Sequence, residues 1–464
     1  MHMLVSLLDV PWSQHMSYAL ILLIFEGLLF IYLLLCGRAE RLSEKQVLLF
    51  SFCLTISWIY TPSLPSEDLW RYLWDGVVTN SGLSVYKYPP NHPYMDTVSL
   101  NNEGLAAVRA QIGHSYLVTI YPAGAQLVFA LVTLTAQPLI ALKLLTSCCF
   151  LASTYVLLRL CNDSNIPAGY ASLYGLCPMI CFEAVVGAHI DFIALFLLIA
   201  GLYYFRLNRY ASAGFILGIS GSIKYLPWCI AILIFLWACT NRKSTQWTML
   251  FKFVCFTIVG ATVPYIYFLN DSDRLVGSLH TYLAKWSFNA GLYELLTFSL
   301  SGVGEHVSKI ISQDHVLTSL LRQSIHGEGA LAADEWTFLL SKVVLATCLC
   351  IWSIHWLMAR RSLYIFLAKF CMGCILISPV VYPWYLTWAI IFCPLIFMDH
   401  RQLCIALTLW TVLIMMSYFA RIMWLKYGLW YLPKSLILFE YSIVGLTMLL
   451  TKRYTAAQTW PKLG

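Results

Sequence analysis

The chain has 464 residues, of which 60% are hydrophobic and only 11% are charged. An ordinary soluble protein carries about 25% charged residues, so this composition is typical of a membrane protein. The formal net charge of +7 is modest, and no basic stripe or nucleic-acid motif accompanies it, which argues against a nucleic-acid partner.

Apolar runs recur along the whole chain, and many are long enough to cross a bilayer as a helix. Backbone groups in lipid must bond internally, so the sequence predicts an all-α polytopic protein of roughly 12 to 14 transmembrane or re-entrant helices, several too short for a full crossing. The expected elements are residues 16–36, 46–61, 122–137, 139–158, 167–185, 190–205, 211–223, 226–240, 247–269, 336–358, 363–381, 383–398, 402–419 and 435–451.

Basic residues between the apolar runs indicate the topology. Clusters near residues 38–45, 206–209, 242–243, 360–361 and 452–453 are expected on the cytoplasmic side. This places two long loops, 62–120 and 270–335, outside. If every span from residue 122 onward crosses the membrane, Arg206 falls on the non-cytoplasmic side, against the positive-inside rule. One element between 122 and 206 is therefore broken, re-entrant or miscounted. We expect a single membrane domain, 1–464, that includes both outer loops.

The head of the first outer loop carries an acidic pair, Glu67 and Asp68, directly after an apolar span. A carboxylate at this boundary suits a general base that takes a proton from an acceptor hydroxyl. The alternative is a helix N-cap just before Leu69. Arg71 shares a helical face with Asp68, so it either holds a phosphate or pairs with Asp68. Asp75 follows one turn later.

Three ionisable residues interrupt later apolar stretches. His189 and Asp191 lie close together, and ionisable groups at membrane depth are costly and usually functional. The alternative is a pair that reaches the interface, and His-x-Asp alone is no metal signature. Lys224 stands beside a helix break at Pro227, where it suits a phosphate, or it pairs with Asp191.

Two outer segments remain open in function. Loop 270–335 is polar, holds four histidines, and is expected to act as an acceptor site or lid with short amphipathic helices. Residues 378–388 form an aromatic and proline cluster that includes Trp384 and Tyr385. It is either a substrate-binding element or an interfacial aromatic belt with a kink.

In chain order these features resemble the GT-C superfamily of polyprenyl-phosphate-sugar-dependent glycosyltransferases, and most of all its bacterial and archaeal mannosyltransferase-like branch. The Asp-x-x-Arg-Tyr-x-x-Asp-Gly motif of that branch is matched by Asp68, Arg71, Tyr72, Asp75 and Gly76.

The resemblance extends over about residues 65 to 390. Of a Gly-x-Asn-Pro-Tyr element only Gly82 and Tyr86 remain, and a Tyr-Pro pair is matched by Tyr121 and Pro122. The Gly-His-x-Asp element has one extra residue between Gly187 and His189. The last matches are the Lys-x-x-Pro element, at Lys224 and Pro227, and the Pro-Trp-Tyr-x-x-Trp element, at Pro383, Trp384, Tyr385 and Trp388.

The resemblance implies transfer of a sugar, mannose in that branch, from a polyprenyl monophosphate to a hydroxyl of a glycan, lipid or protein. Asp68 is then the base of an inverting reaction on the outer face of a bacterial plasma membrane. No cofactor is predicted, and dependence on a divalent metal stays open. The substrate-binding residues implied are Glu67, Arg71, Tyr72, Asp75, Tyr86, Tyr121, His189, Asp191, Lys224, Trp384 and Tyr385.

Two other classes of function remain alternatives. A lipid or sugar transporter would show inverted repeats and a midplane polar site, and no repeat is visible. A glycan ligase or polymerase with a lipid-diphosphate donor would place His and Arg in a late outer loop. Loop 270–335 does contain Arg274, His280, His306 and Arg322.

Overall fold

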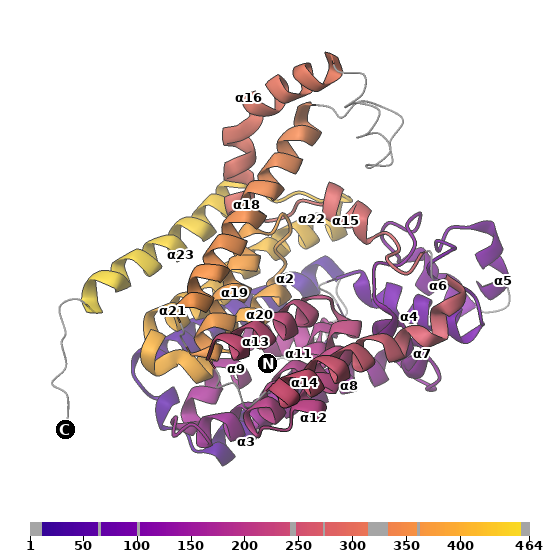
Figure 1. Ribbon diagram of the computed structural model, residues 1–464. Helices are drawn as coiled ribbons and strands as arrows, with labels where there is room; N and C mark the ends of the chain where they lie inside the picture. Colours follow the sequence, from indigo (N-terminus) through magenta and orange to yellow (C-terminus); the bar gives the residue numbers. More distant parts are fainter. Residues whose placement is uncertain are drawn as a thin grey trace, which may run out of the picture.

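The computed structural model (Figure 1) describes residues 12–63, 66–99, 103–241, 247–271, 274–313, 333–359 and 362–455. Within these ranges every regular element is a helix, and the pairing of extended backbone is limited to one bridge between Phe288 and Val380. The all-α fold predicted from the sequence is therefore confirmed.

The N-terminal half builds the first outer loop and most of the packed core. Its elements, with η for a 3-10 helix, are α2 (Trp12–Leu35), η1 (Ala39–Arg41), α3 (Glu44–Trp58), α4 (Asp68–Asn80), η2 (Pro93–Met95), α5 (Asp96–Ser99), α6 (Glu103–Ala110), α7 (Ala123–Thr133), α8 (Pro138–Asn162), η3 (Ala168–Ala171), α9 (Ser172–Gly175), α10 (Pro178–Val185), α11 (Asp191–Arg206), α12 (Tyr210–Ile223) and α13 (Leu226–Asn241).

The C-terminal half closes the bundle and carries the second outer segment. Its elements are α14 (Trp247–Thr262), η5 (Val263–Asp271), α15 (Leu279–Lys285), α16 (Gly291–Gln313), α18 (Ala333–Met358), α19 (Leu363–Ile377), η6 (Pro383–Leu386), α20 (Thr387–Ile390), α21 (Cys393–Leu413), η7 (Ile414–Tyr418), α22 (Phe419–Tyr427) and α23 (Lys434–Thr455).

Five helices of the described ranges are long and apolar enough to cross a membrane, or six if one bent pair is a single span. They are Gln14–Leu35, Pro138–Asn162, Trp247–Asp271, Trp336–Met358 and Cys393–Tyr427. Four further apolar helices are shorter: Ala123–Thr133, Tyr210–Ile223, Leu226–Thr240 and Leu363–Ile377. The protein is a polytopic membrane protein in which, as expected, several elements are too short for a full crossing.

Two contacts between α3 and α8 define the ends of the bundle. At one end Asn162 Nδ2 donates to Glu44 Oε1 at 2.8 Å. At the same end Arg206 donates to the carbonyl of Asp163. At the other end Lys143 Nζ donates to the Thr61 carbonyl at 2.6 Å. The basic clusters near 38–45 and 206–209 therefore share one end, and the first outer loop begins at the opposite end.

The element between α8 and α11 is broken. Ala168–Gly175 and Pro178–Val185 are bent by 54° where the chain passes from α9 to α10. Pro178 stands at the start of α10, where its missing N–H costs no hydrogen bond. This break lies where the positions of the basic residues require one element to be broken.

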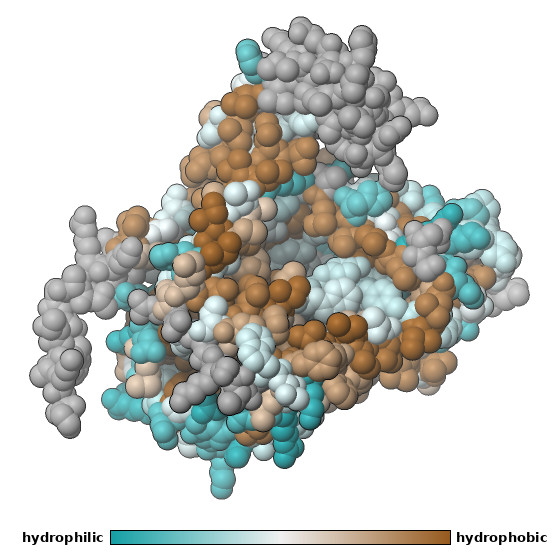
Figure 2. Space-filling view, viewed as in Figure 1, coloured by the Kyte–Doolittle hydropathy of each residue, from teal (hydrophilic) through white to brown (hydrophobic). Residues whose placement is uncertain are grey.

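Helices α12 and α14 pack closely through glycines. A Cβ at Gly214 would lie 2.2 Å from the Phe253 carbonyl oxygen, and one at Gly260 would lie 2.2 Å from that of Phe215. Small residues let two helix backbones approach in a membrane, where apolar burial does not drive association. The pair makes a rigid flank under a brown, hydrophobic surface (Figure 2).

The described part of the second outer segment contains a short helix, α15, and a longer one of 23 residues, α16, where the sequence predicts short helices. Helix α16 pairs with α18, and the two project away from the body in Figure 1. His280 and His306 fall on these helices, whereas His315, Arg322 and His326 lie outside the described residues.

Candidate active site

Helix α4 places Asp68 in its first turn, close to His189. The backbone N–H of Asp68 donates to Ser66 Oγ at 3.0 Å, and Asp68 is the first helical residue. The N-cap position belongs to Glu67, whose side chain makes no capping bond. The alternative interpretation of Asp68 as a helix cap is therefore wrong, and its carboxylate is left to face other side chains.

His189 lies between Asp68 and a second carboxylate. Its Nδ1 is 3.9 Å from Asp68 Oδ2, and its Nε2 is 3.1 Å from Glu183 Oε2. Ala188 has a φ of +49°, which turns the chain between α10 and α11 so that the ring enters the core. A Cβ at Gly187 would lie 2.6 Å from Glu183 Oε2, so only glycine leaves room for this pair.

Glu183 is a residue that the sequence analysis missed as a site candidate. It is fully buried on α10, and the ring of His189 is fully buried too. The available signal was a carboxylate within an apolar helix, because ionisable groups at membrane depth are usually functional.

Lys224 is paired. Its Nζ lies 3.1 Å from Asp191 Oδ2, while Trp388 Nε1 donates to Asp191 Oδ1 at 3.0 Å. Lys224 is in an extended conformation between α12 and α13, so the predicted helix break is present. Its ammonium also lies 5.5 Å from the centre of the Tyr121 ring, within cation–π range.

The Lys224–Asp191 pair borders a cavity of about 210 Å³, which we call the lysine cavity. Lys224 keeps 22% of its side chain exposed there, whereas Asp191 is buried. Its polar and aromatic wall is formed by Asp191, Lys224, Tyr225, Ser378, Tyr385 and Trp388.

The environment of Asp68 disfavours its charge. Although 38% of the side chain is exposed, burial raises the pKa of this carboxyl to about 6. Lys224 opposes that shift electrostatically, and Asp191 and Glu67 add to it. A carboxyl with a pKa close to neutrality is suited to accept a proton.

The other matched residues of the first loop hold the loop in place. Arg71 Nε bonds Asp75 Oδ1 at 2.8 Å, and its Nη1 donates to the Leu117 carbonyl at 2.9 Å. Of the two alternatives for Arg71, the pair with Asp68 is therefore wrong, because the guanidinium bonds the buried Asp75 one turn later. Gln126 donates to Asp75 Oδ2 at 3.2 Å and ties α4 to α7.

Three tyrosines that the resemblance implied lie in the same region. The Tyr72 and Tyr121 rings meet edge to face with their centres 5.1 Å apart. The Tyr86 hydroxyl donates to the Tyr121 carbonyl at 3.0 Å. Tyr121 thus joins the loop to the wall beside Lys224.

The late aromatic element lies against His189. The Trp384 ring stacks on the His189 ring at 3.8 Å, and Tyr382 stacks on Trp384 at 4.5 Å. The hydroxyls of Tyr385 and Tyr282 are 2.8 Å apart, which links η6 to α15. The cluster is therefore part of the site and not only a membrane belt.

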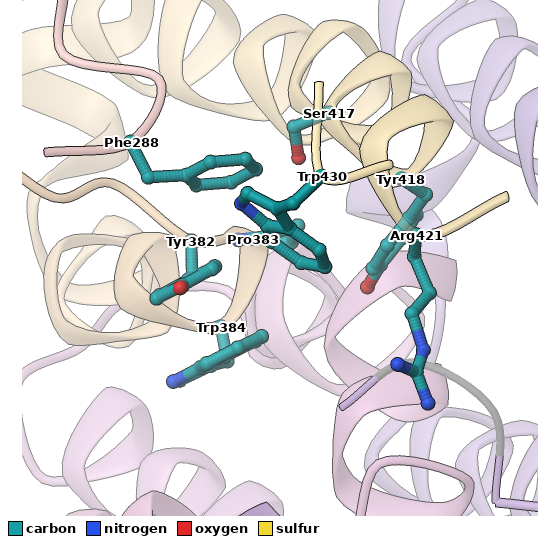
Figure 3. Close-up of a pocket in the computed structure, with 8 residues that line it drawn as sticks. All are labelled: Phe288, Tyr382, Pro383, Trp384, Ser417, Tyr418, Arg421 and Trp430. Carbon is teal, nitrogen blue, oxygen red and sulfur yellow. The ribbon is translucent and has the colours of Figure 1, made fainter. Parts of the chain in front are cut away.

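A second small cavity lies beside Trp384, and we call it the aromatic recess (Figure 3). Its volume is about 10 Å³. Arg421 lines it from α22 and bonds Glu67 Oε1 at 2.7 Å, a buried arginine that sequence reasoning did not place here. The lining consists of Phe288, Tyr382, Pro383, Trp384, Ser417, Tyr418, Arg421 and Trp430.

The described ranges contain no group of three or more His, Cys, Asp or Glu side chains placed to hold a metal ion. His189 approaches two carboxyl groups, at 3.9 Å and 3.1 Å, but neither ring nitrogen makes a hydrogen bond within the described ranges.

A partly exposed carboxylate and a lysine beside a cavity, within a polytopic helical bundle, are an arrangement that an integral-membrane enzyme can use. The chain belongs to the MptA_B family, described as Alpha-(1->6)-mannopyranosyltransferase, N-terminal domain, whose model matches residues 2–241. The protein is therefore a glycosyltransferase of a mannosyltransferase family. The match includes Asp68, His189 and Lys224, and it ends before Trp384. No curated protein and no solved structure matches the chain.

Proposed function

We propose that the protein transfers a mannosyl residue from a polyprenyl-phosphate donor to an acceptor hydroxyl, with inversion at the anomeric carbon. The observation that supports this most is that Asp68, in the first turn of α4, and Lys224, in the break between α12 and α13, lie close enough to interact electrostatically. One is a carboxylate with a pKa of about 6, and the other is a cation on a cavity.

In this mechanism Asp68 takes the proton of the acceptor hydroxyl as its oxygen bonds to the anomeric carbon. The bond from that carbon to the phosphate oxygen breaks, and its electron pair leaves with the phosphate. Lys224 stabilises the growing negative charge on that oxygen. Attack from the face opposite the leaving group inverts the configuration.

The surroundings of the lysine cavity fit a lipid-linked donor. Its wall continues from Lys224 to Leu226 on α13 and to Ile375 on α19, which are apolar helices. A prenyl chain would follow these helices while its phosphate meets Lys224. The chain shows no Gly-rich βαβ fingerprint of the kind that binds nucleotides, which disfavours a nucleotide-sugar donor.

We also propose that the site faces outward, in a bacterial plasma membrane. Asp68 follows the end of α3 that lies opposite the basic clusters near 38–45 and 206–209. By the positive-inside rule those clusters are cytoplasmic, so the site opens on the other side.

The test is transfer by the purified, reconstituted protein from radiolabelled sugar donors. We expect product from polyprenyl-phosphate mannose and none from GDP-mannose. Product only from a lipid-diphosphate-linked glycan would favour the ligase alternative, and product only from GDP-mannose would overturn the proposal. Loss of product in Asp68→Asn then assigns the base.

A further inference from the structure

Both the aromatic recess and the lysine cavity border η6. Trp384 lines the aromatic recess, and its neighbour Tyr385 lines the lysine cavity, so the 3-10 helix forms the wall between them. The two sets of lining residues have no member in common. If the lysine cavity takes the donor phosphate, the recess is a separate space on the other side of that wall.

The recess contains buried hydroxyls without partners. Ser417 Oγ and the Tyr418 hydroxyl both line it, each residue is 3% exposed, and neither has a hydrogen-bond partner within the described ranges. Leaving a buried hydroxyl unpaired costs free energy, so such groups normally meet a ligand or water. Figure 3 shows Tyr418 beside the recess, with Trp430 across from it.

The recess is also connected to Asp68. Trp384 stacks on His189, whose Nδ1 is 3.9 Å from Asp68 Oδ2. On the other side Arg421 bonds Glu67, the residue directly before Asp68. The recess is therefore joined to the proposed base through Trp384 and His189 on one side and through Arg421 and Glu67 on the other.

We propose that the aromatic recess is the acceptor subsite, which binds one hydroxyl group of a pyranose through Ser417 and Tyr418. This inference rests on the proposed function and assigns its second substrate. A volume of about 10 Å³ admits a group of the size of one water molecule, which is the size of a hydroxyl and not of a sugar ring.

The ring of the acceptor would then lie outside the recess, against Trp430. This indole is 48% exposed at the rim and packs against Phe288 at 5.4 Å. An aromatic ring offers an apolar face to the C–H groups of a sugar, while Arg421 and Glu67 offer a charged donor and acceptor to its hydroxyls. The donor's anionic phosphate is better matched by Lys224, which separates the two substrates by charge.

The test uses the full-length protein in nanodiscs, with polyprenyl-phosphate mannose as donor and methyl α-D-mannopyranoside as acceptor. Tyr418→Phe and Trp430→Ala should each raise the acceptor KM by about three- to tenfold, the effect of one lost hydrogen bond or ring contact. The donor KM should not change. Monodeoxy acceptors identify the hydroxyl that the recess binds. Removal of that hydroxyl should raise the acceptor KM of the wild type and should not raise that of Tyr418→Phe any further.

Two control variants remove similar groups elsewhere. Tyr174→Phe and Ser172→Ala change a buried tyrosine and a buried serine of α9, outside the recess. They should leave the acceptor KM unchanged. An unchanged acceptor KM in Tyr418→Phe, with a change in thermal stability only, would show that the recess holds a structural water and would overturn the inference. A raised donor KM instead would also overturn it.

The inference and the proposed function fail in different ways. If the wild-type protein transfers nothing from polyprenyl-phosphate mannose, the proposed function fails. The acceptor subsite is then tested by the binding of methyl α-D-mannopyranoside alone. Methyl α-D-mannopyranoside should then change the tryptophan fluorescence of the wild type and change it less in Trp430→Phe. Absence of binding, or equal binding in Tyr418→Phe, would contradict an acceptor subsite here.

Discussion

Lys224 and Asp191 form an ion pair with 3.1 Å between Nζ and Oδ2, and the second oxygen of Asp191 is fixed by Trp388. The pair with Asp191, one of the two interpretations of Lys224 drawn from the sequence, is therefore confirmed, and the phosphate contact stays a proposal. The pair holds the lysine in place, and the exposed part of the ammonium faces the lysine cavity. Asp191 acts in this arrangement as a positioning residue for the cation.

Replacement of Lys224 by alanine should lower turnover by about tenfold or more, because a preorganised positive charge is lost from the leaving oxygen. Lys224→Arg should recover only part of the activity, since a forked guanidinium does not reproduce a point charge. The measurement is turnover with polyprenyl-phosphate mannose, together with the thermal midpoint of each variant.

The double variant separates structure from chemistry. Lys224→Ala leaves Asp191 buried without its cation, which should destabilise the fold. Adding Asp191→Ala should restore thermal stability and leave turnover low. Recovery of turnover along with stability would mean that Lys224 has a structural role only.

Asp68→Asn should lower turnover by about a hundredfold or more while the protein still inserts, because the amide cannot accept the acceptor proton. Asp96→Asn is the matched control: Asp96 is an acid of the same outer loop, and it pairs with Arg109 at 2.6 Å. Turnover should be close to wild type in that control. Turnover of Asp68→Asn that equals the control would remove Asp68 as base.

The pH dependence follows from the pKa of Asp68. Burial raises this pKa from 3.8 to about 6, and only the deprotonated carboxylate is a base. Turnover should therefore fall below pH 6 by about tenfold per unit and level off above it. Initial rates between pH 4.5 and 8 measure this, and a profile that is flat between pH 5 and 7 contradicts the assignment.

Much of the site was predictable because its residues are unusual where they stand. His189, Asp191 and Lys224 interrupt apolar stretches, and an ionisable residue at membrane depth is costly and usually functional. The break beside Lys224 followed from Pro227, which disfavours helix at the residue before it. These signals depend only on neighbouring residues, so they can be recognised without knowledge of the fold.

The partners of these residues were harder to predict, because they depend on which helix faces come together. Arg71 was expected beside Asp68, but Asp75 lies on the same helical stripe and is the more buried carboxylate. Arg421 reaches Glu67 across 354 positions of sequence, and no local pattern predicts such a contact. Glu183 was passed over since nothing in the sequence shows that its oxygen meets His189.

The orientation of the outer loop can be tested with introduced cysteines. Thr97 is exposed in the first outer loop, and Asp163 is exposed at the end that carries the basic clusters. An impermeant thiol reagent added to intact cells should label Thr97→Cys and should label Asp163→Cys only after lysis, with the unsubstituted protein as background. The reverse pattern would invert the topology and with it the outward site.

Glu183 gives the sharpest test of the residues around His189. Its carboxyl group is fully buried and lies 3.1 Å from Nε2, so we expect it to set which nitrogen of the imidazole carries a proton and how the ring is turned toward Asp68. Glu183→Gln keeps the shape of the side chain but replaces the carboxyl group by an amide. It should lower turnover by about tenfold or more, with little change in the donor KM, since Lys224 is untouched.

Glu440→Gln is the matched control for this substitution. Glu440 is also a buried carboxylate, but it accepts hydrogen bonds from Trp410 and Asn289, and it has no contact with His189 within the described ranges. Both variants replace a buried carboxyl group by an amide, so both are expected to change thermal stability. Only Glu183→Gln should also change the pH profile of turnover, because only Glu183 acts on the imidazole beside Asp68. Identical pH profiles for wild type and Glu183→Gln would restrict Glu183 to a packing role.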